Sequence, residues 1–340
     1  MLHHLSGHRK TLSAVWIVAA LCSTPSGAAE NAYLPIRNHN PFLQIFGLPQ
    51  FQTGSLTPAG RSVTQLSLDV ANHSDAGGSG PETAVIDGES YYLNFGWRRG
   101  WSERLEVGLA LPLVAHQRGF LDGPVKRWHD LSGLSNGNRQ GRDNQLLFSY
   151  ARSTGPGFRL DSPNLSVGDL RLTAAWSLRK SADDSGLAFR TSLKLPTGDE
   201  DKLAGSGAAD LAMGIYATDN SLLSFSRLSG TAFAGVLLLG EGNVLPSRQK
   251  ESVGFAGVST AWQFSETFAV TGQLYGQSAY FDSDIDEIGG NSVQLAVGGS
   301  YRPRNSALVF SLGIIEDLFS DATTDVAFHF GIRAGLGQRR

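Results

Sequence analysis

The chain has 340 residues, of which 41 are glycine and only 17% are charged, and its formal net charge is −3. This length suits one large domain or two small ones. The weak net charge without a basic stripe argues against a nucleic-acid partner, and the many glycine-punctuated apolar runs favour an all-β chain over a disordered one.

The N-terminal region has the pattern of a secretory signal peptide. A basic pair precedes a short apolar run at residues 12–21, and small residues follow up to Ala29. The apolar run is too short to span a bilayer, so we predict a signal peptide over residues 1–29. The single cysteine, Cys22, lies inside it. Removal of the peptide would therefore leave no disulfide or thiolate metal site.

Period-two alternation dominates the chain after residue 40. Every second residue is leucine or valine along 105–113, and every second residue is apolar along 326–332. Such stretches run for about ten residues, the length of a tilted membrane-crossing strand. Short turns alternate with long polar loops between them. This pattern predicts a closed antiparallel transmembrane β-barrel with its apolar face toward lipid.

The number of strands follows from the sidedness of the connections. Thirteen stretches alternate clearly, among them 144–152, and a further crossing between residues 152 and 168 makes the number even. We therefore predict about fourteen strands, with twelve as the alternative, in a barrel over residues 62–340, closed because lipid offers no partner to an open strand edge. Residues 30–61 alternate poorly and are predicted to form a periplasmic arm or a segment inside the lumen.

Several phrases of the sequence resemble a known family. In order, they are "LPIRNHNPFLQIFGLP" (34–49), "DGESYYLNF" (87–95), "GFLDGPVKRWHDLSGLSNGNR" (119–139), "VGDL" (167–170) and "LPTGD" (195–199). Together they resemble the domain of unknown function 3187 family, which groups predicted Gram-negative outer-membrane proteins. The resemblance covers essentially the whole mature chain. It implies an outer-membrane barrel and supplies neither a reaction nor a substrate.

The long loop at residues 116–143 carries a Trp-His-Asp triple. Its Asp-Gly-Pro start suits the beginning of a short helix, whose apolar side would fold inward and narrow the barrel mouth. The residues expected in this lid are Phe120, Asp122, Trp128, His129 and Asp130. In this interpretation His129 and Asp130 pin the lid by hydrogen bonds. Ligand contact and catalysis by His129 stay open, although neighbours on one short helix do not converge as a Ser-His-Asp triad requires.

Charged residues on the polar strand faces are candidates for the lumen. They either pair across it or line a wet path, because an unpaired buried charge is costly. The set is Arg98, Arg104, Glu106, Asp169, Arg171, Arg190 and Lys194. The mature histidines are scattered without ligand spacing, so no metal site and no cofactor are expected. Aromatic residues near strand ends, including Tyr92, Tyr275 and Tyr280, are expected to form interfacial girdles.

These observations favour a porin-like channel or transporter for a small solute, a step from architecture to function. No enzymatic activity is predicted. Two alternatives stay open, an outer-membrane lipid-modifying enzyme using His129 and a closed structural or adhesion barrel. The expected location is the outer membrane of a Gram-negative bacterium after signal-peptide cleavage. The expected partners are outer-membrane lipid, a small solute and the barrel-assembly machinery.

Overall fold

The computed structural model describes the chain from residue 33 onward in six stretches, which are 33–132, 144–153, 157–180, 185–223, 227–319 and 322–336. In this part of the chain, fifteen strands join in one antiparallel sheet. No helix among the described residues is long and apolar enough to cross a membrane.

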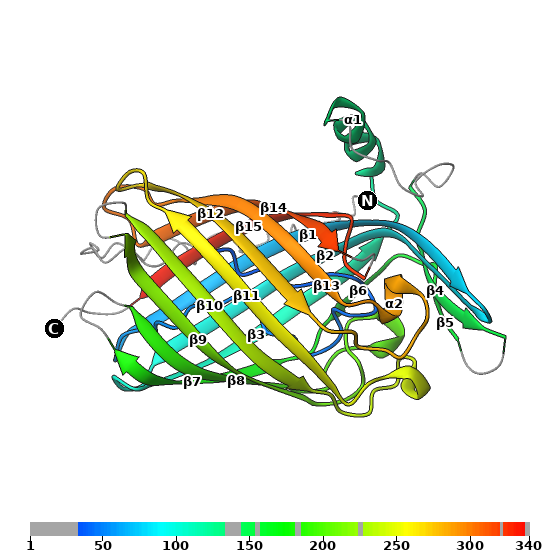
Figure 1. The fold of residues 1–340 in the computed structure, drawn as a ribbon, viewed down its shortest axis with the longest axis horizontal. Helices are drawn as coiled ribbons and strands as arrows, with labels where there is room; N and C mark the ends of the chain where they lie inside the picture. The colour runs from blue at the N-terminus through cyan, green and yellow to red at the C-terminus, as the bar shows by residue number, and fades with distance from the viewer. Residues whose placement is uncertain are drawn as a thin grey trace, which may run out of the picture.

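Twelve of the strands in the described residues close into a barrel (Figure 1), because β1 pairs with β15 on one edge and with β2 on the other, and β2 continues to β3. The closed all-β barrel is therefore confirmed, with the smaller of the two predicted strand numbers. The barrel strands are β1 (Ser62–Ser79), β2 (Glu82–Gly100), β3 (Leu105–Gln117), β7 (Arg171–Lys180), β8 (Gly186–Lys194), β9 (Asp210–Leu223), β10 (Leu228–Leu238), β11 (Ser252–Trp262), β12 (Phe268–Gln277), β13 (Ser292–Tyr301), β14 (Leu308–Phe319) and β15 (Val326–Leu336).

Three further strands do not cross the membrane, which corrects the prediction of crossings at 144–152 and between 152 and 168. β1 has 18 residues and β2 has 19, and the hairpin that they form extends beyond the barrel at the long-loop end (Figure 1). β4 (Leu147–Arg152) pairs with this extension and β5 (Phe158–Leu160) pairs with β4. β6 (Asn164–Val167) pairs with the end of β3. Alternation reveals a strand but not its pairing partner.

The outer surface of the barrel is apolar. Leu312 is 60% exposed, whereas its inward neighbour Gly313 is buried. At the short-turn end, which is the periplasmic end in outer-membrane barrels, exposed aromatic rings contact one another in series at 5.9, 6.0 and 4.6 Å between centroids. These rings belong to Trp262, Phe264, Phe268 and Tyr301. They form one part of the predicted girdle.

Other aromatic residues predicted for the girdle lie inside the barrel instead. Tyr92, Tyr275 and Tyr280 are buried, at 2%, 2% and 0% exposure. Their ring sizes and positions near strand ends are the same as in a girdle. For Tyr92 and Tyr275 the strand register decides whether the ring faces lipid or lumen, since successive residues of a strand point to opposite faces. Tyr280 lies in the connection after β12.

Short helical elements occur only in the connections of the described residues. The 116–143 loop contains α1 (Asp122–Ser132), as its sequence predicts. The other elements are η1 (Glu200–Lys202), η2 (Pro246–Arg248) and α2 (Asp286–Gly289). Figure 1 shows α1 standing clear of the barrel wall rather than across its mouth.

We expect Leu312→Arg to destabilise the folded barrel by about 2–4 kcal/mol, because it places a charge on the lipid face near the middle of β14. The matched control Phe264→Arg lies in the aromatic belt and should cost about 0–1 kcal/mol. Urea unfolding in lipid vesicles measures both changes. Equal losses for the two variants would contradict the orientation of the outer face.

Candidate functional site: a filled lumen

Residues 33–58, which we call the luminal segment, run inside the barrel. Every side chain from Tyr33 to Leu48 is buried, although these residues belong to no strand. Of the two places predicted for residues 30–61, the described part occupies the lumen. It brings a length of irregular backbone into the space enclosed by the strands.

The luminal segment goes toward the long-loop end and returns. Tyr33 Oη accepts a hydrogen bond from Arg98 Nη2 at 3.0 Å, in the periplasmic half of β2. Asn40 Nδ2 donates to the carbonyl of Glu287 in the opposite, long-loop end at 3.1 Å. The Thr57 amide then donates to Glu106 Oε2 at 2.7 Å, back near the periplasmic turn after β2. The segment thus occupies most of the barrel's height.

Apolar side chains anchor the segment at the long-loop end and in the middle. The ring of Phe46 stacks on Tyr280 at 5.1 Å, and Phe51 meets Phe233 edge-on at 4.9 Å. Both phenylalanines are completely buried, and burial of each contributes about 1.5–3 kcal/mol. Leu34 fits against two glycines of the wall: a Cβ on Gly313 would lie 2.6 Å from Leu34 Cδ1.

Cations of the barrel wall bind the backbone of the segment. Arg171 donates from Nη1 to the Leu48 carbonyl at 3.1 Å and from Nη2 to the Phe46 carbonyl at 3.0 Å. Arg190 donates to the carbonyls of Thr53 and Ser55 at 2.8 Å each. Lys194 Nζ donates to the Ile45 carbonyl at 3.0 Å. A buried carbonyl needs a hydrogen-bond partner. Because the backbone of the segment pairs with no strand, its carbonyls find these partners in side chains of β7 and β8.

The same cations also form buried ion pairs. Lys194 Nζ lies 2.6 Å from Asp169 Oδ2 and 3.2 Å from Asp210 Oδ2. Arg190 Nη1 lies 2.7 Å from Glu106 Oε1, and Arg98 Nη1 lies 3.8 Å from the same oxygen. Pairing offsets part of the cost of burying these charges. The wall therefore has two separate clusters of paired charges, and each cluster is also bonded to the segment.

A second polar cluster crosses three neighbouring strands. His329 Nδ1 on β15 lies 2.6 Å from Asp69 Oδ1 on β1, and its Nε2 lies 3.1 Å from Ser311 Oγ on β14. The other carboxylate oxygen of Asp69 lies 3.3 Å from His39 Nε2 of the luminal segment. The cluster joins the wall to the segment. It also places a hydroxyl, an imidazole and a carboxylate in series.

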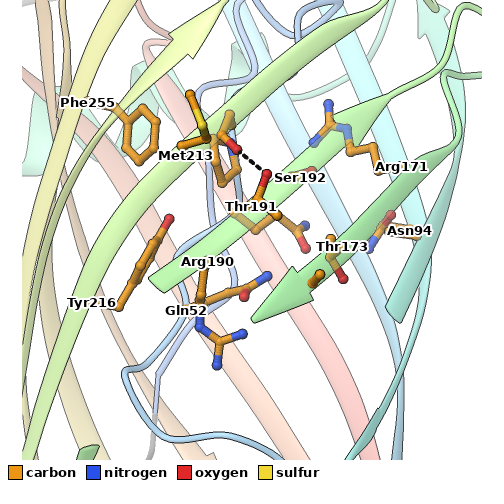
Figure 2. A pocket seen from close by; sticks show the side chains of 15 residues that line it. Gln52, Asn94, Arg171, Thr173, Arg190, Thr191, Ser192, Met213, Tyr216 and Phe255 are labelled. Atoms are coloured by element: carbon orange, nitrogen blue, oxygen red, sulfur yellow. Dashed lines mark hydrogen bonds between the residues drawn. The ribbon is translucent and has the colours of Figure 1, made fainter. Parts of the chain in front are cut away.

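A cavity of about 40 Å³ stays open between the segment and the wall of β2, β3, β7, β8, β9 and β11 (Figure 2). The segment contributes Pro49, Gln50 and Gln52 to its lining. Figure 2 shows Arg171, Thr173 and Asn94 on one side of the space and Phe255, Met213 and Tyr216 on the other. None of the fifteen lining residues is acidic.

Six of the seven predicted lumen residues lie on the inner wall, namely Arg98, Glu106, Asp169, Arg171, Arg190 and Lys194. Arg104 does not. It is exposed in the turn between β2 and β3, because the strand ends at Gly100 and resumes only at Leu105. The period-two pattern of the sequence continues through Arg104, so it predicted a strand residue where the structure has a turn.

The described part of the predicted lid does not lie over the lumen. Phe120 is 65% exposed, and α1 projects away from the barrel (Figure 1). Asp122 ties the base of the loop to the barrel, because its carboxylate accepts hydrogen bonds from Asn72 and the Asn144 amide at 3.0 and 2.7 Å. The side chains of Trp128, His129 and Asp130 lie outside the described residues. The luminal segment occupies the path instead.

Sequence reasoning missed one group of residues in the lumen. Asp210, Ser311 and His329 come from separate strands, and no local spacing connects them. The segment itself left a signal in its combination of prolines and buried-type apolar residues without alternation. Proline has no amide to give to a sheet, so such a stretch beside barrel strands indicates backbone that is packed rather than paired.

The chain can now be placed among known proteins. A family model described as a protein of unknown function, DUF3187, matches residues 10–336. The chain belongs to this family. No curated protein matches it in sequence. The family assignment suggested by the sequence phrases is thus confirmed.

Solved structures of outer-membrane proteins match the chain at low identity. The COG4313 outer membrane channel from Pseudomonas putida F1 is 11% identical, with a TM-score of 0.55 over 83% of this chain and 98% of that one. The toluene transporter TbuX of Ralstonia pickettii is 10% identical, with a TM-score of 0.39 over 83% and 90%. The NanC porin is 7% identical, with a TM-score of 0.44 over 82% and 100%. The first of these supports the fold of an outer-membrane barrel for this member of the DUF3187 family.

We expect Lys194→Met to destabilise this DUF3187 barrel by about 3–5 kcal/mol, because it leaves two buried carboxylates, Asp169 and Asp210, without their cation. The control Lys202→Met breaks an exposed pair with Asp199 and should cost less than about 1 kcal/mol. Urea unfolding followed by tryptophan fluorescence compares the two. A loss at Lys194 no larger than at Lys202 would show that the pairs are not buried.

Proposed function

We propose that the protein is an outer-membrane channel for a small solute, exported by a signal peptide at residues 1–29 and closed in this structure by the luminal segment. Passage then requires the segment to move. The described part of the 116–143 loop, which includes α1, stands clear of the barrel mouth (Figure 1).

The observation that carries this proposal is that a separable segment, rather than the wall, fills the interior. Wall side chains alone fill a barrel of about eight strands, and barrels of about 16–18 strands leave an aqueous channel. With twelve strands, removal of residues 33–58 leaves a lumen lined by charged and polar groups such as Arg171, Glu106 and Gln273. A polar lining suits a wet path.

The segment is also attached by bonds that can be exchanged. Its backbone groups bind side chains of the wall, as where Gln273 accepts from the Leu34 amide at 2.5 Å and donates to the Leu34 carbonyl at 3.0 Å. No backbone ladder with a barrel strand holds it among the described residues, apart from the bridge of Ala59 to Gly100 where it enters β1. The barrel therefore keeps its closed sheet when the segment moves.

Single-channel recording in planar bilayers tests the channel. We expect a variant lacking residues 33–56 to conduct steadily, and the intact chain to conduct less or only in brief openings. Circular dichroism and resistance to unfolding by detergent verify that the shortened barrel folds. A folded variant that never conducts would overturn the proposal.

A cysteine tether tests closure in the full chain. Leu34 Cδ1 is two bonds from its Cβ and lies 2.6 Å from the position of a Cβ on Gly313, so cysteines at both positions are within reach of a disulfide, whose Cβ atoms are about 3.5–4.5 Å apart. We expect the oxidised Leu34→Cys/Gly313→Cys variant to lose its openings and reductant to restore them. Leu34→Cys alone, which leaves Gly313 in place, is the control. Unchanged openings after oxidation would contradict gating by the segment.

A second candidate function, hydrolysis by a serine nucleophile, is favoured by one observation. Ser311, His329 and Asp69 have the hydrogen-bond order and spacing of a catalytic triad. In that chemistry His329 would take the hydroxyl proton as Ser311 attacks an ester carbonyl and return it to the departing alkoxide. Water, deprotonated by His329, would then attack the acyl group on Ser311, release the acid and restore the hydroxyl. Their strand positions alone also account for a structural network that includes His39.

Covalent labelling distinguishes these roles. If the triad is active, a fluorophosphonate probe should label Ser311 in the refolded full chain, and His329→Gln should reduce the labelling at least tenfold. Ser300→Ala, at the register position beside Ser311 on β13, is the control and should label normally. An absence of any Ser311 adduct in a folded protein would leave only the structural role.

A further inference from the structure

We infer that the cavity beside Arg171 is a binding site for the carboxylate group of a small monovalent organic acid. That such acids are also the solutes that pass through the barrel is a consequence that rests on the proposed function. The binding site itself stands on the geometry of the cavity.

Two buried donors at the cavity have no acceptor. Arg171 Nε and Gln50 Nε2 are both buried and without a hydrogen-bond partner among the described residues, and both residues line the cavity. Arg171 is only 7% exposed. A buried donor left unpaired costs about 1–3 kcal/mol, and more for a charged group. The cavity thus presents N–H groups from both the wall and the luminal segment to whatever occupies it.

Two cations line the cavity, Arg171 and Arg190, and only one of them has an ion-pair partner among the described residues. Arg190 Nη1 lies 2.7 Å from Glu106 Oε1. Arg171 has no described carboxylate within 4.0 Å, so its bonds go to neutral carbonyls. A single negative charge in the cavity restores the balance.

A carboxylate fits these donors better than a spherical anion does. The planar guanidinium group of an arginine matches the two oxygens of a carboxylate, and the charge makes these hydrogen bonds stronger than bonds to a neutral carbonyl. Asn94 and Thr173 add polar groups on the same side, and Phe255 and Tyr216 face them across the cavity (Figure 2). This arrangement suits an acid group that carries a short apolar tail.

The size of the cavity limits the tail in the closed state. A volume of about 40 Å³ holds roughly three water-sized groups. Pro49, Gln50 and Gln52 form one wall, so an acid the size of propionate, with five non-hydrogen atoms, enters only if the luminal segment shifts. A carboxylate at Arg171 also competes with the carbonyls of Phe46 and Leu48. Binding and movement of the segment are therefore coupled at this residue.

Calorimetric titration of the full mature chain in detergent micelles tests the site, with sodium propionate as the probe and propionamide as its uncharged analogue. We expect saturable binding of propionate and none of propionamide at the same concentration. Arg171→Gln should weaken propionate binding at least tenfold, whereas the control Arg104→Gln, in the exposed turn, should leave it unchanged. Gln50→Leu should weaken it several-fold and keeps the bonds from Arg171 to the segment, so it serves if Arg171→Gln does not fold.

Three outcomes would overturn the inference. Equal binding of propionate and propionamide would show that charge is not recognised. Binding of nitrate as tight as that of propionate would show a general anion site. No binding by a folded chain would mean that the cavity holds only water. The two proposals can fail separately. If the full chain binds propionate but the variant lacking residues 33–56 does not conduct, only the channel proposal is overturned. If that variant conducts but the full chain does not bind propionate, only the binding site is overturned.

Discussion

Twelve strands enclose a space that their own inward side chains do not fill, and the rest of the structure depends on how this space is occupied. The luminal segment supplies the missing atoms. It brings with it backbone amides and carbonyls, which need partners away from water. Arg171, Arg190 and Lys194 provide partners for its carbonyls, and the carboxylates of Glu106, Asp169 and Asp210 keep two of these cations paired. The charged side chains of the inner wall are therefore explained by the need to bind the backbone of the segment, whether or not they also bind a solute.

The segment is held in two different ways along its length. Toward the long-loop end, completely buried rings such as Phe42 and Phe46 hold it by excluding water. Toward the periplasmic end, hydrogen bonds from Arg190 and to Glu106 hold it. An acceptor on a solute can replace a backbone carbonyl with little change in energy, whereas an apolar anchor is lost when water reaches it. The carbonyls bonded to Arg171 and Arg190 are thus where a solute can compete with the segment.

The barrel strands could be predicted from the sequence because side chains in a membrane strand alternate between the lipid and the lumen. Side chains such as Leu312 and Arg171 alternate between lipid and lumen, so the barrel and most of its inner charges follow from period two. The rule fails where a strand leaves the barrel, as at β4, or where a turn interrupts it, as at Arg104. It also cannot decide which side of the wall an aromatic ring takes, and Tyr275 and Tyr280 face the lumen rather than the interface.

The sequence by itself determined the barrel, its apolar outer face, its family and a stretch before the first strand that pairs with no sheet. Each of these depends on neighbours in the chain or on a local pattern of residue types. Only the tertiary structure decided that the stretch fills the lumen, that Lys194 lies between Asp169 and Asp210, and that Asp69, His329 and Ser311 meet. The contact between Asp69 and His329 joins residues 260 positions apart, and it exists because closing the sheet brings its first strand against its last.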